Sequence, residues 1–68
     1  MIIQYDSSTD LLYLRLGQRT QELVNRRVTD DIVLDIGIDD KIIGIEILDA
    51  SKKVQLDELL PIQFLQGD

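Results

Sequence analysis

The chain has 68 residues with a formal net charge of −6, and it contains neither cysteine nor histidine. This composition excludes disulfides, thiolate chemistry, a Cys/His zinc site and an imidazole acid or base. A chain of this length forms a single domain, residues 1–68, whose core supplies only about 3–5 kcal/mol, so oligomerisation is the stabilising supplement that remains.

The N-terminal part of the chain predicts a β-hairpin. Residues 2–5 have the composition of a strand, residues 6–10 are turn formers, and residues 11–16 form a second strand. One face of that second strand is purely aliphatic and is the predicted core face, with Leu12, Leu14 and Leu16.

Residues 17–31 have no strong hydrophobic period, and the sequence does not fix their conformation. Residues 17–21 are polar and predict a loop, whereas residues 22–28 have a spacing that fits either a helix or extended chain. We favour extended chain, either irregular or a short edge strand, because the segment has to cross between two hairpins in about a dozen residues.

Residues 32–48 predict a second hairpin and are the most informative part of the sequence. A two-residue turn at Asp39 and Asp40 pairs the large aliphatic side chains of both strands: Ile36 with Ile43, Leu34 with Ile45 and Ile32 with Ile47. Such a turn needs positive φ at both aspartates, so either the turn is strained or the loop is longer. Gly37 and Gly44 predict relief of crowding or a bulge.

After the second hairpin the pattern changes to helical. Asp49 or Ser51 can cap a first helical turn. Asp57 offers a second helix start, and Pro61 restricts it to a short or interrupted helix over residues 58–65. The predicted fold is therefore an α+β domain: a four-stranded antiparallel sheet built from two sequential hairpins, plus a short C-terminal helix. The alternative is a mostly β sandwich of two protomers.

Two strings in the sequence resemble a widespread bacterial family. They are D-x-LY at residues 10–13 and the more specific GIEILDAS at residues 44–51, within a similarity that spans roughly residues 5–53. The chain resembles the domain of unknown function 2283 family. This resemblance implies a small β-rich module with a terminal helix, without an assigned activity and without catalytic or binding residues to carry over. It also suggests an antitoxin-like role beside a toxin-like partner.

Acidic side chains are the plausible ligand-binding set. In the predicted register Asp35 and Glu46 are diagonal neighbours on the face opposite the aliphatic one, which makes them the candidate site for a weakly bound ligand. The more ordinary interpretation is that both carboxylates solvate the outer face of the sheet, paired with Arg15. The spacing does not match a calcium loop, and we predict neither a dedicated metal site nor a cofactor.

The outer face is also more apolar than a free sheet face usually is. The residues that make it so are Leu11, Tyr13, Val33 and Ile42. Two explanations stand side by side: this face is the interface of a homodimer, with Tyr13 as its anchor, or the C-terminal segment covers it.

The sequence as a whole predicts a non-enzymatic interaction module, a homodimer in the cytoplasm with a basic protein partner. A divalent-metal or small-ligand binding protein is the alternative. The acidic charge opposes nucleic acid as a partner, and no apolar run approaches the roughly 20 residues that a membrane span needs. The chain has no histidine, and no lysine is convincingly placed as a base for Ser7, Ser8 or Ser51, so no hydrolase is expected.

Overall fold

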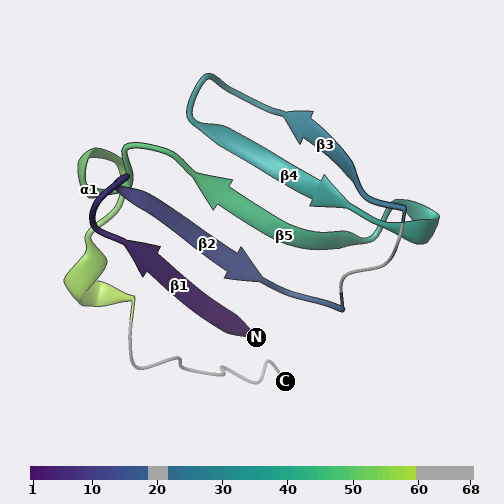
Figure 1. Cartoon of the computed structure of the whole chain (residues 1–68), viewed down its shortest axis with the longest axis horizontal. Coiled ribbons are helices and arrows are strands. Elements are labelled where there is room, and N and C mark those ends of the chain that lie inside the picture. The colour runs from purple at the N-terminus through teal and green to yellow at the C-terminus, as the bar shows by residue number, and fades with distance from the viewer. Residues whose placement is uncertain (19–21, 60–68) are drawn as a thin grey trace, which may run out of the picture.

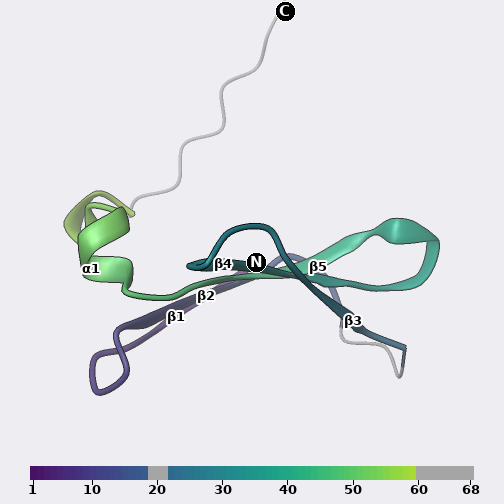
Figure 2. The same ribbon diagram turned by 90° about the horizontal axis from the view of Figure 1, so that it is seen from above.

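One five-stranded antiparallel sheet forms the body of the protein. The computed structural model describes residues 1–18 and 22–59, and the strand order within them is β1-β2-β5-β4-β3 (Figure 1). The strands are β1 (Ile2–Asp6), β2 (Leu11–Arg15), β3 (Val24–Arg27), β4 (Ile32–Ile36) and β5 (Ile42–Ile47). The helical elements are the 3-10 turn η1 (Ile38–Asp40), the helix α1 (Ala50–Lys53) and the 3-10 turn η2 (Leu56–Glu58). Seen along its edge, the sheet is one layer (Figure 2).

The strand that the sequence analysis did not count is β3. The four-strand prediction is wrong, because residues 24–27 pair with β4 as an edge strand. All four of these residues are exposed, so neither face of the strand is buried and no alternation of polarity marks it in the sequence. The extended conformation that we favoured for this segment is confirmed. The helix predicted over residues 58–65 lies, from residue 60 onward, outside the described part of the chain.

The aliphatic side chains collect on one face of the sheet, as predicted. Ile32 lies opposite Ile47, and Leu34 lies opposite Ile45, which confirms two of the three predicted pairs. We call this surface the aliphatic face; its aliphatic side chains from β1, β2, β4 and β5 are Ile3, Leu12, Leu14, Ile32, Leu34, Ile36, Ile43, Ile45 and Ile47. Three of these nine side chains are buried (Leu12, Ile36 and Ile43), and the other six are half-buried.

The third predicted pair is wrong, because β5 contains a bulge. The register shifts between Asp35 and Ile36, so that Ile36 pairs with Ile42 and Ile43 is the extra residue. The carbonyl of Ile43 accepts hydrogen bonds from the backbone amides of Leu16 at 2.7 Å and Gly17 at 3.1 Å. The bulge therefore provides a hydrogen-bond acceptor for two backbone amides at the end of β2. The β4–β5 hairpin alone does not include these amides.

The turn between β4 and β5 is centred where the sequence predicts it. Asp39 and Asp40 have φ angles of 59° and 57°, the left-handed values that a two-residue hairpin turn requires. The amide of Lys41 closes the turn on the carbonyl of Ile38 at 3.3 Å. Both aspartates therefore occupy a region that non-glycine residues seldom adopt. The loop is longer than the predicted two residues, because the Gly37 amide donates to the Lys41 carbonyl at 2.8 Å and Ile36 pairs with Ile42.

Asp10 holds the start of α1, although it is 41 positions away from Ser51 in the sequence. Its carbonyl accepts from the Ala50 amide at 2.9 Å, and its carboxylate accepts from the amide and the hydroxyl of Ser51 at 3.0 and 2.7 Å. The Tyr5 hydroxyl donates to the same carboxylate at 2.7 Å. The predicted cap is wrong, because Asp49 makes no side-chain cap bond and Ser51 is the donor, not the acceptor.

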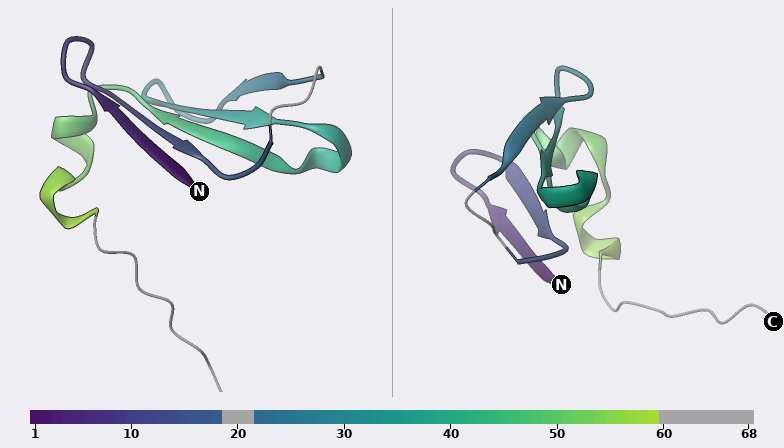
Figure 3. Two further views of the ribbon diagram at one scale, coloured as in Figure 1. Left: turned by 60° about the horizontal axis from the view of Figure 1, so that its bottom comes forward. Right: turned by 90° about the vertical axis from the view of Figure 1, so that its right-hand side faces the viewer.

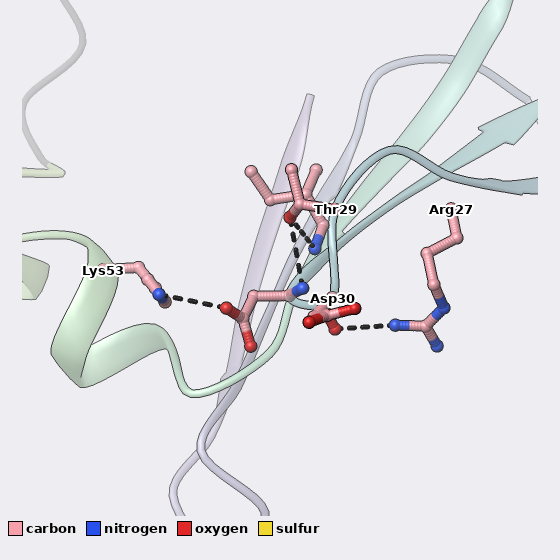
Figure 4. A network of polar contacts seen from close by, with 6 residues as sticks. Arg27, Thr29, Asp30 and Lys53 are labelled. Atoms are coloured by element: carbon pink, nitrogen blue, oxygen red, sulfur yellow. Dashed lines mark hydrogen bonds and ion pairs between the residues drawn. The ribbon is translucent and has the colours of Figure 1, made fainter.

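A second contact ties the other end of α1 to the sheet (Figure 4). Lys53 forms an ion pair with Asp31 in the β3–β4 turn at 3.0 Å, and the Thr29 hydroxyl accepts from the amide of Asp31 at 3.1 Å. An exposed ion pair of this kind contributes about 0–1 kcal/mol, so it orients the helix more than it stabilises it. The left view of Figure 3 shows α1 at one end of the sheet, beside the β1–β2 turn.

The hydrogen bonds to Asp10 predict a pH dependence of stability. The Ser51 hydroxyl, then the Tyr5 hydroxyl, hold the pKa of Asp10 below its ordinary value of 3.8. A carboxylate with a depressed folded-state pKa contributes stability that is present above the unfolded pKa and is lost as the pH falls through the folded pKa. In urea unfolding at stepped pH, we expect the free energy of unfolding to fall below about pH 4, and Asp10→Asn to weaken this fall.

The pH experiment has an internal control. Asp57→Asn removes the same charge from an exposed position in η2 and should keep the pH profile of the unaltered protein. Ser8 lowers the pKa of Asp6, so part of the acid sensitivity should survive in Asp10→Asn. A profile identical in all three proteins would contradict the assignment of the effect to Asp10.

Candidate functional site

The face opposite the aliphatic face carries two adjacent rows of cross-strand neighbours. The first row runs across all five strands as Gln4, Tyr13, Glu46, Val33 and Arg27. The second row, two residues along each strand, runs as Ile2, Arg15, Gly44, Asp35 and Asn25. Because cross-strand partners share a face, we call this surface the polar face.

A hollow of about 410 Å³ opens on the polar face. Every strand contributes one polar side chain to its lining, and Leu11 adds an apolar one: Gln4, Leu11, Tyr13, Asn25, Asp35 and Glu46. A second hollow of about 300 Å³ shares Asn25 and Glu46 with the first. The two hollows therefore adjoin, and their polar groups come from sequence positions as far apart as the first and the last strand.

Asp35 lies in the lining of this hollow and is nevertheless 2% exposed. The Tyr13 hydroxyl donates to Asp35 Oδ2 at 3.2 Å, which is long for an O–H···O hydrogen bond. Asp35 Oδ1 is buried and has no hydrogen-bond partner in the described part of the chain. A buried acceptor left unpaired costs about 1–3 kcal/mol, and such an atom in a folded protein calls for an explanation.

Gly44 makes the burial of Asp35 possible, because it lets the Tyr13 ring lie against the sheet. A methyl group at Gly44 would lie 2.8 Å from both Cε1 and Cζ of Tyr13, closer than side-chain carbons approach in proteins. Gly44 is also the direct cross-strand partner of Asp35. The predicted role of this glycine, relief of crowding beside a bulky neighbour, is thus what the structure displays.

The structure brings the predicted ligand pair together. Asp35 lies opposite Gly44 and Glu46 lies opposite Val33, so the two carboxylates are diagonal neighbours, and both line the hollow. Arg15 does not pair with Asp35 as the ordinary interpretation proposed. Its Nε donates to the carbonyl of Gly17 at 3.2 Å instead.

The four predicted interface residues separate into two groups. Leu11 and Tyr13 line the hollow, and Val33 lies beside it in the first row. Ile42 is exposed at the end of β5, and the bulge pairs it with Ile36, which belongs to the aliphatic face. The predicted set therefore does not form one surface.

The sequence analysis did not identify Gln4 and Asn25 as site residues. Gln4 is an ordinary polar residue of a strand, and only the pairing of β1 with β2 places it beside Tyr13. Asn25 reaches the site because β3 pairs with β4, a pairing that no period in the sequence indicates. Among residues 1–18 and 22–59, no group of three or more carboxylate, histidine or cysteine side chains is placed to hold a metal ion.

These features define a small single-sheet protein with a polar, carboxylate-containing hollow on one face. The chain belongs to the family described as proteins of unknown function, DUF2283, whose match covers residues 2–51. No curated protein and no solved structure matches the chain. The resemblance inferred from the sequence is confirmed, and the matched residues include the whole lining of the hollow.

The two strings that carry the resemblance lie side by side in the structure. Residues 10–13 and residues 44–51 meet where β2 pairs with β5, with Tyr13 opposite Glu46. They meet again where Asp10 accepts from Ser51. The contact between Asp10 and Ser51 holds α1, and the pairing of Tyr13 with Glu46 forms part of the hollow. The two strings that carry the resemblance therefore also contribute to the candidate site.

Proposed function

We propose that the protein is a non-enzymatic interaction module that works as a homodimer, with the aliphatic faces of two copies packed together. The observation that carries this proposal is an aliphatic face that the described residues cover only in part, since six of its nine aliphatic side chains are half-buried. Sheets of globular proteins bury such a face against a second layer, about 10 Å away. A second copy of the chain supplies that layer.

Charge favours face-to-face pairing over pairing through β3. The nine aliphatic side chains of this face carry no charge, and the pairing with Leu34 adds a single charged residue of β3, Arg26, to the same face. Along the exposed edge strand β3, by contrast, Arg26 and Arg27 are adjacent. Antiparallel pairing of two copies of β3 would bring these like charges close together, which is unfavourable.

The lining of the hollow supports a binding role over a catalytic one. It offers two carboxylates, a phenol and two amides, and among the described residues it contains no serine, threonine, cysteine or lysine that could act as a nucleophile. The acidic chain fits a basic protein as its second partner, and an antitoxin-like role beside a basic toxin is the concrete form of this proposal. We place the protein in the cytoplasm, in keeping with its lack of cysteine.

Two neighbouring residues of β4 test the dimer, because Leu34 points to the aliphatic face and Val33 to the polar face. Both are half-buried, and both can be replaced by glutamine. An amide at Leu34 would be buried in both copies of the dimer, at about 1 kcal/mol or more in each. We therefore expect Leu34→Gln to raise the dimer dissociation constant by about 30-fold and Val33→Gln to leave it within about threefold, as measured by light scattering across a dilution series.

Circular dichroism should show that both variants keep their strand content, so that dissociation is not confused with unfolding. An unaltered protein that is monomeric at every concentration would overturn the dimer. So would a dimer that Val33→Gln dissociates as strongly as Leu34→Gln does.

A further inference from the structure

We propose that the hollow over Asp35 is a recognition site for an arginine side chain of a partner protein, with Asp35 Oδ1 accepting from its guanidinium group. This rests on the proposed interaction role, but not on the dimer, because the hollow lies on the opposite face of the sheet. The observation behind it is a carboxylate oxygen that is buried in the lining of the hollow and has no hydrogen-bond partner among the described residues.

The charge of the lining selects a cation. Two of its six residues are carboxylates and the remaining four are uncharged. Arg15 and Arg27 are the arginines in the two rows of cross-strand neighbours on the polar face, and both donate to backbone carbonyls. Arg15 donates to the carbonyl of Gly17. Arg27 Nη1 donates to the carbonyl of Asp30 at 2.6 Å (Figure 4). Neither arginine donates to Asp35 Oδ1, which leaves this oxygen for a positive group of a partner.

The shape and composition of the lining favour a guanidinium group. A guanidinium presents five donors in one plane, so separate N–H groups can bind Asp35 and its diagonal neighbour Glu46. An ammonium group is a compact charge that lacks this planar arrangement of donors. The Tyr13 ring beside Asp35 adds a flat aromatic surface on which a guanidinium can stack.

The Tyr13 side chain controls the access of a guanidinium group to Asp35. Its hydroxyl holds Asp35 Oδ2 at 3.2 Å, and a charged donor forms shorter and stronger hydrogen bonds to a carboxylate. The ring of Tyr13 lies over Gly44. Rotation of the Tyr13 side chain would then expose Asp35 to the incoming guanidinium, so that charge-assisted hydrogen bonds replace the long one from Tyr13 to Asp35.

The test uses the full chain and short peptides that differ at one residue. Acetyl-Gly-Gly-Arg-Gly-Gly-amide is titrated into the isotopically labelled protein, and the backbone amide signals of Tyr13, Asp35 and Gly44 are followed by NMR. The citrulline peptide is the matched control, because it keeps the shape of arginine and has no charge. We expect saturable shifts around these amides with the arginine peptide, and binding at least about tenfold weaker with the citrulline peptide.

Three variants separate recognition by Asp35 from attraction to an acidic protein. Asp35→Asn should weaken the arginine peptide at least about tenfold, whereas Asp57→Asn removes the same charge at a distance and should change binding less than about twofold. Tyr13→Phe removes the competing hydroxyl and should bind the arginine peptide at least as tightly as the unaltered protein. The NMR spectrum of each variant also reports whether it is folded.

The proposal is overturned if arginine and citrulline peptides bind alike, if Asp35→Asn binds as well as Asp57→Asn, or if the arginine peptide leaves the signals of Tyr13, Asp35 and Gly44 unmoved. These results would leave the dimer untouched, since light scattering tests it on the other face. Conversely, if the protein is monomeric and binds the arginine peptide through Asp35, the recognition site is supported and the dimer is ruled out.

Discussion

Replacing Leu12 with alanine should leave the protein largely unfolded at 37 °C. Leu12 is 1% exposed and is the largest side chain that is almost fully buried in the described part of the chain. Truncating a buried leucine costs about 2–5 kcal/mol, because apolar contacts are lost and a cavity remains. That cost is comparable to the roughly 3–5 kcal/mol that a single core of this size provides. Urea unfolding followed by circular dichroism, at one fixed protein concentration, measures the loss.

Leu16 is the matched control for this substitution. It follows β2 at the same parity as Leu12 but is 46% exposed, so Leu16→Ala should cost less than about 1 kcal/mol. Equal losses for the two variants would mean that Leu12 does not occupy the core position described here. The protein concentration has to be held constant, because the proposed dimerisation would add to the apparent stability of the unaltered chain.

The sequence determines the second hairpin because two independent signals agree on its register. Residues such as Leu34 and Ile45 alternate with a period of two, and the two aspartates at the turn fix which residues face each other. The offset at Ile43 is not visible in the same residues. It arises where the Ile43 carbonyl accepts from amides at the end of β2, so it depends on the order of the strands in the sheet.

The candidate site was only half predictable for the same reason. Asp35 and Glu46 belong to one hairpin, and the hairpin register alone places them on one face. The burial of Asp35 depends on Tyr13 from β2, and the far side of the hollow depends on Asn25 from β3. An exposed edge strand lacks the alternation of apolar and polar residues by which a strand is predicted. The residues that it contributes to a site therefore cannot be predicted from the sequence.

Gly44→Ala should be the most damaging of the small substitutions on the polar face. Gly44 has no positive φ, so its backbone conformation suits alanine, and in open space this change would stabilise the protein by about 0.4–1 kcal/mol. Here the added methyl group would displace the Tyr13 ring, break its hydrogen bond to Asp35 and overpack the sheet. We expect a loss of about 2–4 kcal/mol in the free energy of unfolding, measured by urea denaturation.

Gly17→Ala provides a comparison with a milder contact. A methyl group there would lie 3.2 Å from Ile43 Cδ1, the end of a flexible side chain that can move by a few tenths of an ångström. The cost should therefore stay below about 1 kcal/mol. This pair of variants separates the effect of the Tyr13 ring from the general effect of adding a methyl group to a glycine of the sheet region.

A double-mutant cycle with Tyr13→Ala decides whether the ring is the cause. In the Tyr13→Ala background the space above Gly44 is empty, so Gly44→Ala should be neutral or stabilising, and the coupling between the two sites should reach about 2 kcal/mol or more. Additive losses would show that Gly44 is required by the backbone of β5 and not by Tyr13. Coupling of the expected size would establish that Gly44 allows Tyr13 to lie over Asp35, the arrangement that buries this carboxylate and leaves its Oδ1 without a hydrogen-bond partner among the described residues.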